Sequence, residues 1–174
     1  MKNKKGDINM KQKYQTKDIV LTGLGIAIVF IATLFIKIPN ALDGYFNLGD
    51  GFILLFASIL DPFLAFLVGG LGSALADVAG GYAYYFIPTL IIKGFEGIIV
   101  SFLLKKYGKK IQIPAYFIGT CIMVGGYFLT KWYLKASLVM ALAGIPENIF
   151  QSGVGIVIAL ICYPLLSRYI EKTN

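Results

Sequence analysis

Long apolar runs alternate with short polar segments along this chain. The runs cover residues 16–36, 48–60, 63–79, 86–104, 113–130 and 136–166. A helix needs about 20 mostly apolar residues to cross the hydrocarbon core of a membrane, so each run is a candidate crossing. The second run is short for a full crossing, and the last one is interrupted by Gly144 and Pro146. The pattern predicts an all-α integral membrane protein, a bundle of six transmembrane helices.

Composition and charge support this class and orient the bundle. Hydrophobic residues make up 57% of the chain, charged residues 14%, and the mean hydropathy is +0.76; soluble domains are about 25% charged. Twelve of the 16 basic residues lie in three short segments, at 2–17, 105–110 and 168–172. Cytoplasmic segments carry such an excess of lysine and arginine, so both termini are predicted to be cytoplasmic. The net charge of +7 is explained by this placement and not by nucleic-acid binding.

We divide the chain into a basic cytoplasmic tail at 1–15, a membrane domain at 16–167 and a cytoplasmic C-terminal tail at 168–174. The first apolar run is longer than a signal-peptide core and no small-residue cleavage site follows it, so we expect it to remain as a helix. The chain has no histidine, and Cys121 and Cys162 lie in apolar runs without a C-x-x-C motif. These absences weigh against a metalloenzyme or a Ser–His hydrolase.

Ionisable residues inside the apolar runs are the main functional signal. Asp50, Asp77, Lys93, Glu96 and Glu147 all lie there. A charged side chain at hydrocarbon depth costs roughly 2.5–3.5 kcal/mol, so it persists where it is paired, faces a wet cavity or binds a ligand. The segment 69–81 is rich in glycine, alanine and serine, which allow helices to approach closely. The sequence therefore predicts a polar cavity in the outer half of the bundle.

The candidate ligand-binding residues come from predicted helices, from the outer loop at 80–85 and from the position that follows the outer loop at 37–46. They are Asn47, Asp50, Asp77, Tyr84, Tyr85, Lys93, Glu96, Glu147, Asn148 and Gln151. Four of them are carboxylates facing one lysine, so the site favours a small neutral or weakly basic ligand with several hydrogen-bond donors. Aromatic residues at 82, 84, 85, 132 and 133 could stack on a flat ring. The structural alternative is that Lys93 and Glu96 form an internal ion pair while Asp77 ties a helix to a loop.

Four motifs carry a family resemblance: NLGD at 47–50, DP at 61–62, GGLGSALADVAGGY at 69–82 and PTLIIKGFEG at 88–97. Together they resemble the substrate-capturing S components of energy-coupling factor (ECF) vitamin importers, most closely the riboflavin-type branch. The resemblance implies a six-helix protein of the bacterial plasma membrane that captures a vitamin or precursor from outside. The resemblance also implies that the chain is not itself an enzyme and holds no cofactor.

The resemblance also implies partners. The first helix would dock through small residues, here Gly23 and Ala27, onto a membrane coupling (T) subunit that carries two ATPase subunits. ATP and Mg²⁺ would bind to those ATPases, and the absence of a G-x-x-x-x-G-K-[ST] loop from this chain agrees with that division. The alternative for Gly23 and Ala27 is packing inside this bundle.

Ligands of the resembled family include riboflavin, thiamine, pantothenate, biotin and pyridine or pyrimidine precursors. The acceptor-rich site favours hydroxymethylpyrimidine or a pyridoxine-like B6 vitamer, while Lys93 keeps pantothenate open and riboflavin remains possible. Two other classes stay open. One is a stand-alone proton-linked permease with Asp77 and Glu96 as relays. The other is a small membrane enzyme acting on a lipid head group through Asp50, Asp77 and Glu96, without a D-x-x-D motif or histidine to support it.

Overall fold

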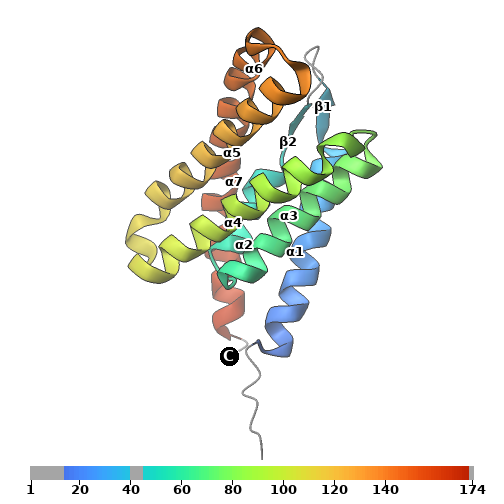
Figure 1. The fold of residues 1–174 in the computed structure, drawn as a ribbon. Helices are drawn as coiled ribbons and strands as arrows, with labels where there is room; N and C mark the ends of the chain where they lie inside the picture. The colour runs from blue at the N-terminus through green and yellow to red at the C-terminus, as the bar shows by residue number, and fades with distance from the viewer. Residues whose placement is uncertain (1–13, 40–44, 173–174) are drawn as a thin grey trace, which may run out of the picture.

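The computed structural model describes residues 14–39 and 45–172, so most of the predicted tail at 1–15 lies outside the described residues. The chain forms seven α-helices, two short 3-10 helices and one two-stranded hairpin within that range (Figure 1). In order these are α1 (Thr16–Phe35), β1 (Lys37–Pro39), β2 (Tyr45–Asn47), α2 (Gly49–Ala57), α3 (Pro62–Ala79), η1 (Ala83–Tyr85), α4 (Phe86–Tyr107), η2 (Lys109–Ile111), α5 (Gln112–Lys135), α6 (Leu138–Ala143) and α7 (Ile145–Lys172).

Five helical segments of the described chain are long and apolar enough to cross a membrane. They are α1, α3, η1 with α4, η2 with α5, and α6 with α7. The second predicted crossing is different, because α2 has only nine residues. At 1.5 Å per residue it extends about 14 Å, roughly half the hydrocarbon thickness. Helix α2 is instead a core element, with Ile53, Leu54 and Phe56 no more than 2% exposed.

Close backbone contact joins α3 to α4 and sets the geometry of the centre. A Cβ atom on Gly97 would lie 2.5 Å from the carbonyl oxygen of Ala65, and one on Gly70 would lie 2.8 Å from that of Leu90. No side chain fits at such distances, so the small residues allow the two helices to meet along their backbones. Helix α3 also packs against α1, α4 packs against α5, and α2 packs against α7.

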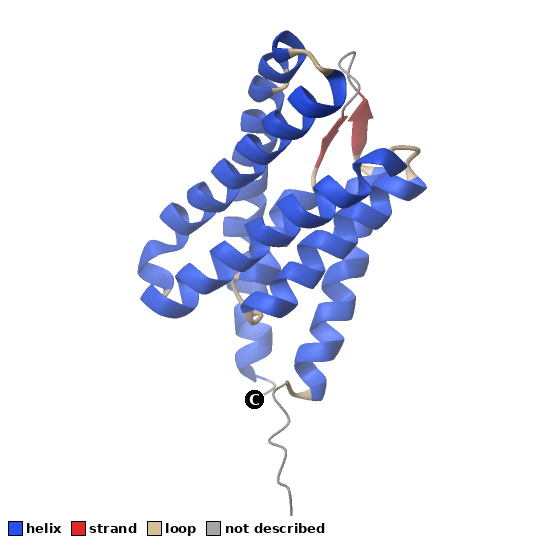
Figure 2. Ribbon diagram, in the orientation of Figure 1, coloured by secondary structure: helices blue, strands red, loops and turns tan. Residues whose placement is uncertain are grey.

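A hairpin replaces the irregular outer loop predicted at 37–46. Strands β1 and β2 pair antiparallel, with Lys37 opposite Asn47 and Ile38 opposite Phe46, while residues 40–44 lie outside the described range. Figure 2 shows the strands at one end of the bundle. The pairing satisfies backbone groups that an irregular loop would leave to water. Lys37 donates from Nζ to the carbonyl oxygen of Gly80 at 3.2 Å, which fixes the hairpin to the end of α3.

The last predicted helix is divided in two. Ser137 begins α6, its hydroxyl accepting from the amide of Met140 at 3.3 Å. Gly144 separates α6 from α7, which continues to Lys172, beyond the predicted domain boundary at 167. The break places Glu147 in the first turn of α7, and Asn148 is the next residue along the chain.

Candidate ligand-binding site

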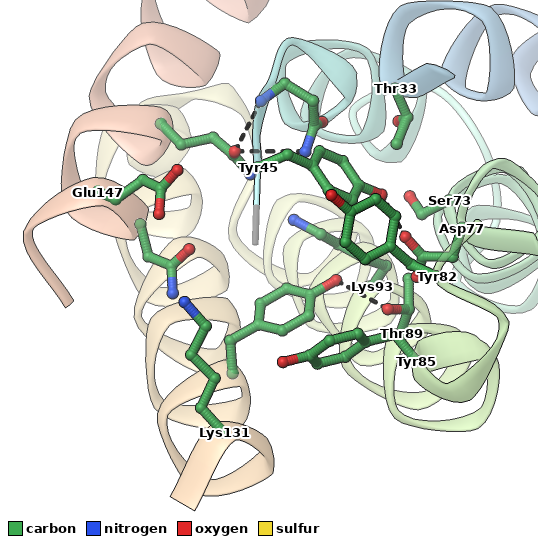
Figure 3. Close-up of a pocket in the computed structure, with 14 residues that line it drawn as sticks. Thr33, Tyr45, Ser73, Asp77, Tyr82, Tyr85, Thr89, Lys93, Lys131 and Glu147 are labelled. Atoms are coloured by element: carbon green, nitrogen blue, oxygen red, sulfur yellow. Dashed lines mark hydrogen bonds between the residues drawn. The ribbon is translucent and has the colours of Figure 1, made fainter. Parts of the chain in front are cut away.

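A polar cavity lies at the hairpin end of the bundle (Figure 3). It has a volume of about 560 Å³, including the part open to solvent. Its lining comes from α1, β2, α3, the η1 turn, α4, α5 and α7. The residues are Thr33, Tyr45, Asn47, Ser73, Asp77, Tyr82, Tyr85, Thr89, Lys93, Tyr127, Lys131, Glu147, Asn148 and Gln151.

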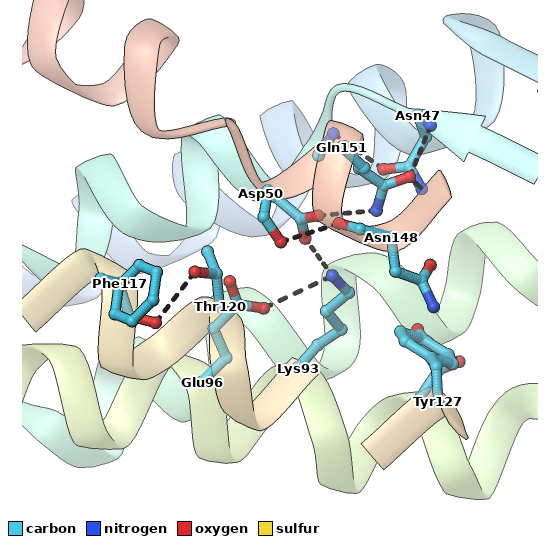
Figure 4. A network of polar contacts seen from close by, with 12 residues as sticks. Asn47, Asp50, Lys93, Glu96, Phe117, Thr120, Tyr127, Asn148 and Gln151 are labelled. Atoms are coloured by element: carbon cyan, nitrogen blue, oxygen red, sulfur yellow. Dashed lines mark hydrogen bonds and ion pairs between the residues drawn. The ribbon is translucent and has the colours of Figure 1, made fainter. Parts of the chain in front are cut away.

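A buried ion-pair network forms the deep side of this cavity (Figure 4). Lys93 on α4 pairs with Asp50 on α2, and its Nζ lies 3.4 Å from Oε2 of Glu96. All three residues are at most 2% exposed. One ammonium thus lies between two carboxylates, so the charge of Lys93 is compensated inside the protein. The predicted Lys93–Glu96 contact exists, but Asp50, from another helix, is the closer partner.

Gln151 on α7 connects this network to the hairpin. Its Nε2 donates to Oδ2 of Asp50 at 2.6 Å, and its Oε1 accepts from the backbone amide of Asn47 at 2.9 Å. Asn47 in turn accepts at Oδ1 from the amide of Gly49, the first residue of α2, at 2.9 Å. Hydrogen bonds therefore join β2, α2, α4 and α7 around one point, and such satisfied networks fix the relative positions of the elements that carry them.

The side of the cavity formed by α1 and α3 carries oxygens without partners. Thr33 Oγ1, Ser73 Oγ and Asp77 Oδ2 are buried and have no hydrogen-bond partner among the described residues. The other carboxylate oxygen of Asp77 accepts a hydrogen bond from the hydroxyl of Tyr45. Buried polar groups are satisfied in the great majority of cases. The unpartnered carboxylate oxygen of Asp77 therefore indicates a ligand that donates hydrogen bonds, and the two hydroxyls beside it can donate or accept.

Tyrosine rings surround the space between the helices. The ring centroids of Tyr45 and Tyr82 are 5.0 Å apart, and those of Tyr85 and Tyr127 are 6.4 Å apart. Burial and the neighbouring Asp77 carboxylate raise the pKa of Tyr45 above its ordinary value, so its hydroxyl stays protonated and can donate. Flat rings with polar tips suit a small aromatic ligand, because they add stacking area and hydrogen bonds together.

The opposite side of the cavity is formed by α5 and α7. It carries Lys131, which is 6% exposed, with Glu147 and Asn148. Lys131 makes no hydrogen bond or ion pair with any described residue. A lysine is almost never buried without a partner. The ammonium group of Lys131 is therefore available to bind a ligand, in addition to the unpartnered oxygen of Asp77.

The comparison with protein families decides the class. The family described as ECF-type riboflavin transporter, S component, matches residues 13–168. The chain belongs to this family of S components. It is therefore a multi-pass integral membrane protein and a transporter component, and the lipid-head-group enzyme considered from the sequence is set aside.

One of the similar proteins is itself named a transporter. The S component is 29% identical over 154 residues to the thiamine precursor transporter HmpT of Lactococcus lactis, covering 87% of this chain and 89% of that one. It is 36% identical over 139 residues to an uncharacterized protein in the gap 3' region of Pyrococcus woesei, covering 75% and 88%. A UPF0397 protein of Leuconostoc citreum is 33% identical over 97 residues, covering 55% and 50%.

The structure brings most of the predicted site residues of the S component together. Those that line the cavity are Asn47, Asp77, Tyr85, Lys93, Glu147, Asn148 and Gln151. Asp50 and Glu96 lie behind Lys93 as its partners instead of lining the cavity. Tyr84, Trp132 and Tyr133 do not line it and are 47%, 49% and 87% exposed. The ring of Tyr45 on the hairpin lies against the ring of Tyr82, and both of these rings line the cavity.

Other lining residues of the S component were not predicted from the sequence: Thr33, Tyr45, Ser73, Thr89, Tyr127 and Lys131. Lys131 also corrects the predicted charge count. The sequence set four carboxylates against one lysine, whereas Lys93 is compensated by Asp50 and Glu96, and a second lysine lines the cavity. A signal was present, because Tyr127 and Lys131 are four residues apart and so share a helix face.

The predicted partner-docking residues lie away from the cavity. Gly23 and Ala27 are exposed on α1, and a Cβ atom on Gly23 would have no neighbour within 4 Å. They therefore take no part in packing the described bundle. Gly25, on the other side of the same helix, packs against Val68 and Phe56 instead.

Proposed function

We propose that this S component captures hydroxymethylpyrimidine, a thiamine precursor, and presents it to coupling subunits for import. The observation that carries the proposal is the unpartnered, buried carboxylate oxygen of Asp77 in a cavity between tyrosine rings. The amino group and flat ring of this ligand match those two features. The similarity to a thiamine precursor transporter over most of both chains supports the same ligand.

The topology proposed for this role has six crossings with both termini cytoplasmic. The first turn of α1 and the last turn of α7 lie at the same end of the bundle, which supports an even number of crossings (Figure 1). Five segments of the described chain are long enough to cross by themselves, and in this proposal the buried α2 supplies the sixth crossing together with its flanking segments. The lysine-rich segment 105–110 lies between α4 and α5, as a cytoplasmic connection would.

The partners in this proposal are a membrane T subunit and two ATPase subunits, which bind ATP and Mg²⁺. The exposed pair Gly23 and Ala27 on α1 suits docking, because small residues let a second helix approach closely. Large apolar side chains such as Val20, Leu24 and Ile31 flank the pair and are 62%, 49% and 52% exposed. A helix docked here would bury them without rearranging the subunit.

Calorimetry on the purified full-length chain tests the ligand. Hydroxymethylpyrimidine is expected to bind more tightly than pyridoxine, pantothenate or riboflavin, and Asn148→Ala is expected to weaken its binding by about 1–3 kcal/mol. Tyr133→Ala is the control, because this residue is 87% exposed and does not line the cavity. Tighter binding of pyridoxine, pantothenate or riboflavin would refute the proposed ligand.

A further inference from the structure

We infer that the cavity binds its ligand at two opposite ends, which select for two different groups. On the α1–α3 side, Asp77 accepts a hydrogen bond from an amino group of the ligand, and the hydroxyls of Ser73 and Thr33 bind the adjacent ring edge. On the α5–α7 side, Lys131, Glu147 and Asn148 bind a neutral hydroxyl arm. This inference rests on the proposed function and deepens it, since it assigns a specificity role to each side.

The α1–α3 side, which we call the acceptor end, is defined by its geometry and by polar atoms that lack hydrogen-bond partners. Asp77 is held in place because one of its oxygens accepts from Tyr45, while the other is buried without a described partner. The unpartnered hydroxyls of Ser73 and Thr33 belong to residues 2% and 3% exposed. The carboxylate accepts from a ring amino group, the neighbouring hydroxyls can donate to the adjacent ring nitrogen, and the carboxylate repels an anionic edge.

On the α5–α7 side, which we call the hydroxyl end, the lysine that binds the ligand is Lys131 and not Lys93. Lys93 lies between Asp50 and Glu96, so its charge is compensated before any ligand arrives. Lys131 is the lining lysine that has no partner among the described residues. Figure 3 shows Lys131 and Glu147 on one side of the cavity and Thr33, Ser73 and Asp77 on the other.

The neighbours of Lys131 favour a neutral hydroxyl over an anion. An ammonium group only donates, a carboxylate only accepts, and an amide does both. A hydroxyl can accept from Lys131 and at the same time donate to the carboxylate of Glu147 or the amide oxygen of Asn148. A phosphate ester or a carboxylate would instead be repelled by the negative charge of Glu147. A phosphate monoester, with about −1.5 to −2 charges at pH 7, would also exceed the single positive charge of Lys131.

Measuring how two variants bind the parent ligand and two of its analogues tests this assignment. In one analogue a methyl group replaces the hydroxymethyl arm, and in the other a hydrogen replaces the amino group. Lys131→Met is expected to weaken binding of the parent ligand about 10- to 100-fold. Binding of the methyl analogue should weaken less than about threefold. Asp77→Asn replaces the unpartnered oxygen by an NH₂ donor. It should weaken binding of the parent ligand by a similar factor and leave binding of the analogue without the amino group unchanged.

Lys135→Met is the matched control, because it removes a lysine from the same helix but outside the cavity lining. It is expected to leave all three affinities unchanged. Binding of each spared analogue to its variant also shows that the variant is folded. The phosphate ester of the parent ligand is expected to bind the unmodified protein at least tenfold more weakly than the parent.

The outcomes separate this inference from the function on which it rests. Equal losses for parent and analogue in both variants, or tight binding of the phosphate ester, would overturn the two-ended assignment while the captured ligand stands. If the unmodified protein binds neither the parent nor either analogue, the proposed function fails and this inference fails with it.

Discussion

Lys93 shows how a single charge is accommodated at hydrocarbon depth. It is compensated by Asp50 and Glu96, and removing one member of such a set leaves the others buried and unpaired. Lys93→Met is therefore expected to lower the free energy of unfolding by about 3–5 kcal/mol. Thermal unfolding of the purified protein in detergent measures this loss. Adding Glu96→Gln to Lys93→Met should recover part of it, because one uncompensated carboxylate is then removed.

The pair formed by Lys105 and Asp61 is the control for this prediction. Its ions are 2.7 Å apart, but their side chains are 52% and 37% exposed, so water already solvates them. Exposed pairs of this kind contribute about 0–1 kcal/mol. Lys105→Met should therefore shift unfolding little. If Lys93→Met proves equally mild, the buried network is not what holds α2, α4 and α7 together.

The residues that the sequence revealed are those with a high cost of burial. Asp50, Asp77, Lys93 and Glu96 are conspicuous in apolar runs because each charge needs a reason to be there. Thr33 and Ser73 carry no such signal, since a hydroxyl in a membrane helix can bond to its own backbone. Lys131 resembled an ordinary lysine at the end of a helix. Only the placement of α5 against α7 shows that it lies in the cavity.

At the scale of elements, α1 presents two different faces. Gly25 packs inward, and a Cβ atom there would lie 2.9 Å from Val68. Gly23 faces outward, with nothing within 4 Å of such an atom. Gly23→Leu, and equally Ala27→Leu, is expected to abolish ligand uptake and co-purification of the coupling subunit. The affinity for ligand and the melting temperature of the isolated subunit should stay unchanged, because no internal contact is lost.

Gly25→Leu is the contrasting variant, two residues away on the same helix. Its side chain would collide with Val68 and Phe56, so the isolated subunit itself should unfold at lower temperature. Uptake assays, pull-down of the coupling subunit and unfolding curves on the variants distinguish the two faces. Loss of ligand affinity in Gly23→Leu would show that this face belongs to the fold of the subunit and not to a docking surface.

Hydropathy predicted the long helices because a membrane crossing requires a long apolar run, and five such segments occur. It could not assign α2, since a short apolar run describes a buried core helix as well as a crossing. The hairpin was not predicted for a related reason. Segment 37–47 contains proline, glycine and aspartate, which are typical of turns, while the contact that holds the hairpin against α3 joins Lys37 to Gly80, 43 residues away in the sequence.

At the scale of the whole molecule, the cavity opens at one end of an otherwise apolar bundle. Below the Lys93 network lies a cluster that includes Leu54, Leu55, Ala65 and Val100, each at most 5% exposed. Asp77 and Glu96, the relays considered for a permease, both lie at the depth of the cavity and are bound to Tyr45 and Lys93. Release on the opposite side therefore requires a large rearrangement of the subunit.

The source of energy for that rearrangement separates an importer subunit from a permease. Liposomes that contain only this chain should bind labelled hydroxymethylpyrimidine in proportion to the protein present, without accumulating it, even under an imposed proton gradient. The chain carries no nucleotide-binding loop, so accumulation is expected only when the T subunit and ATPases are added with ATP and Mg²⁺. A non-hydrolysable ATP analogue is the control and should not support accumulation. Uptake by the lone chain that follows the proton gradient would instead establish a permease, with Asp77 and Glu96 as its relay residues.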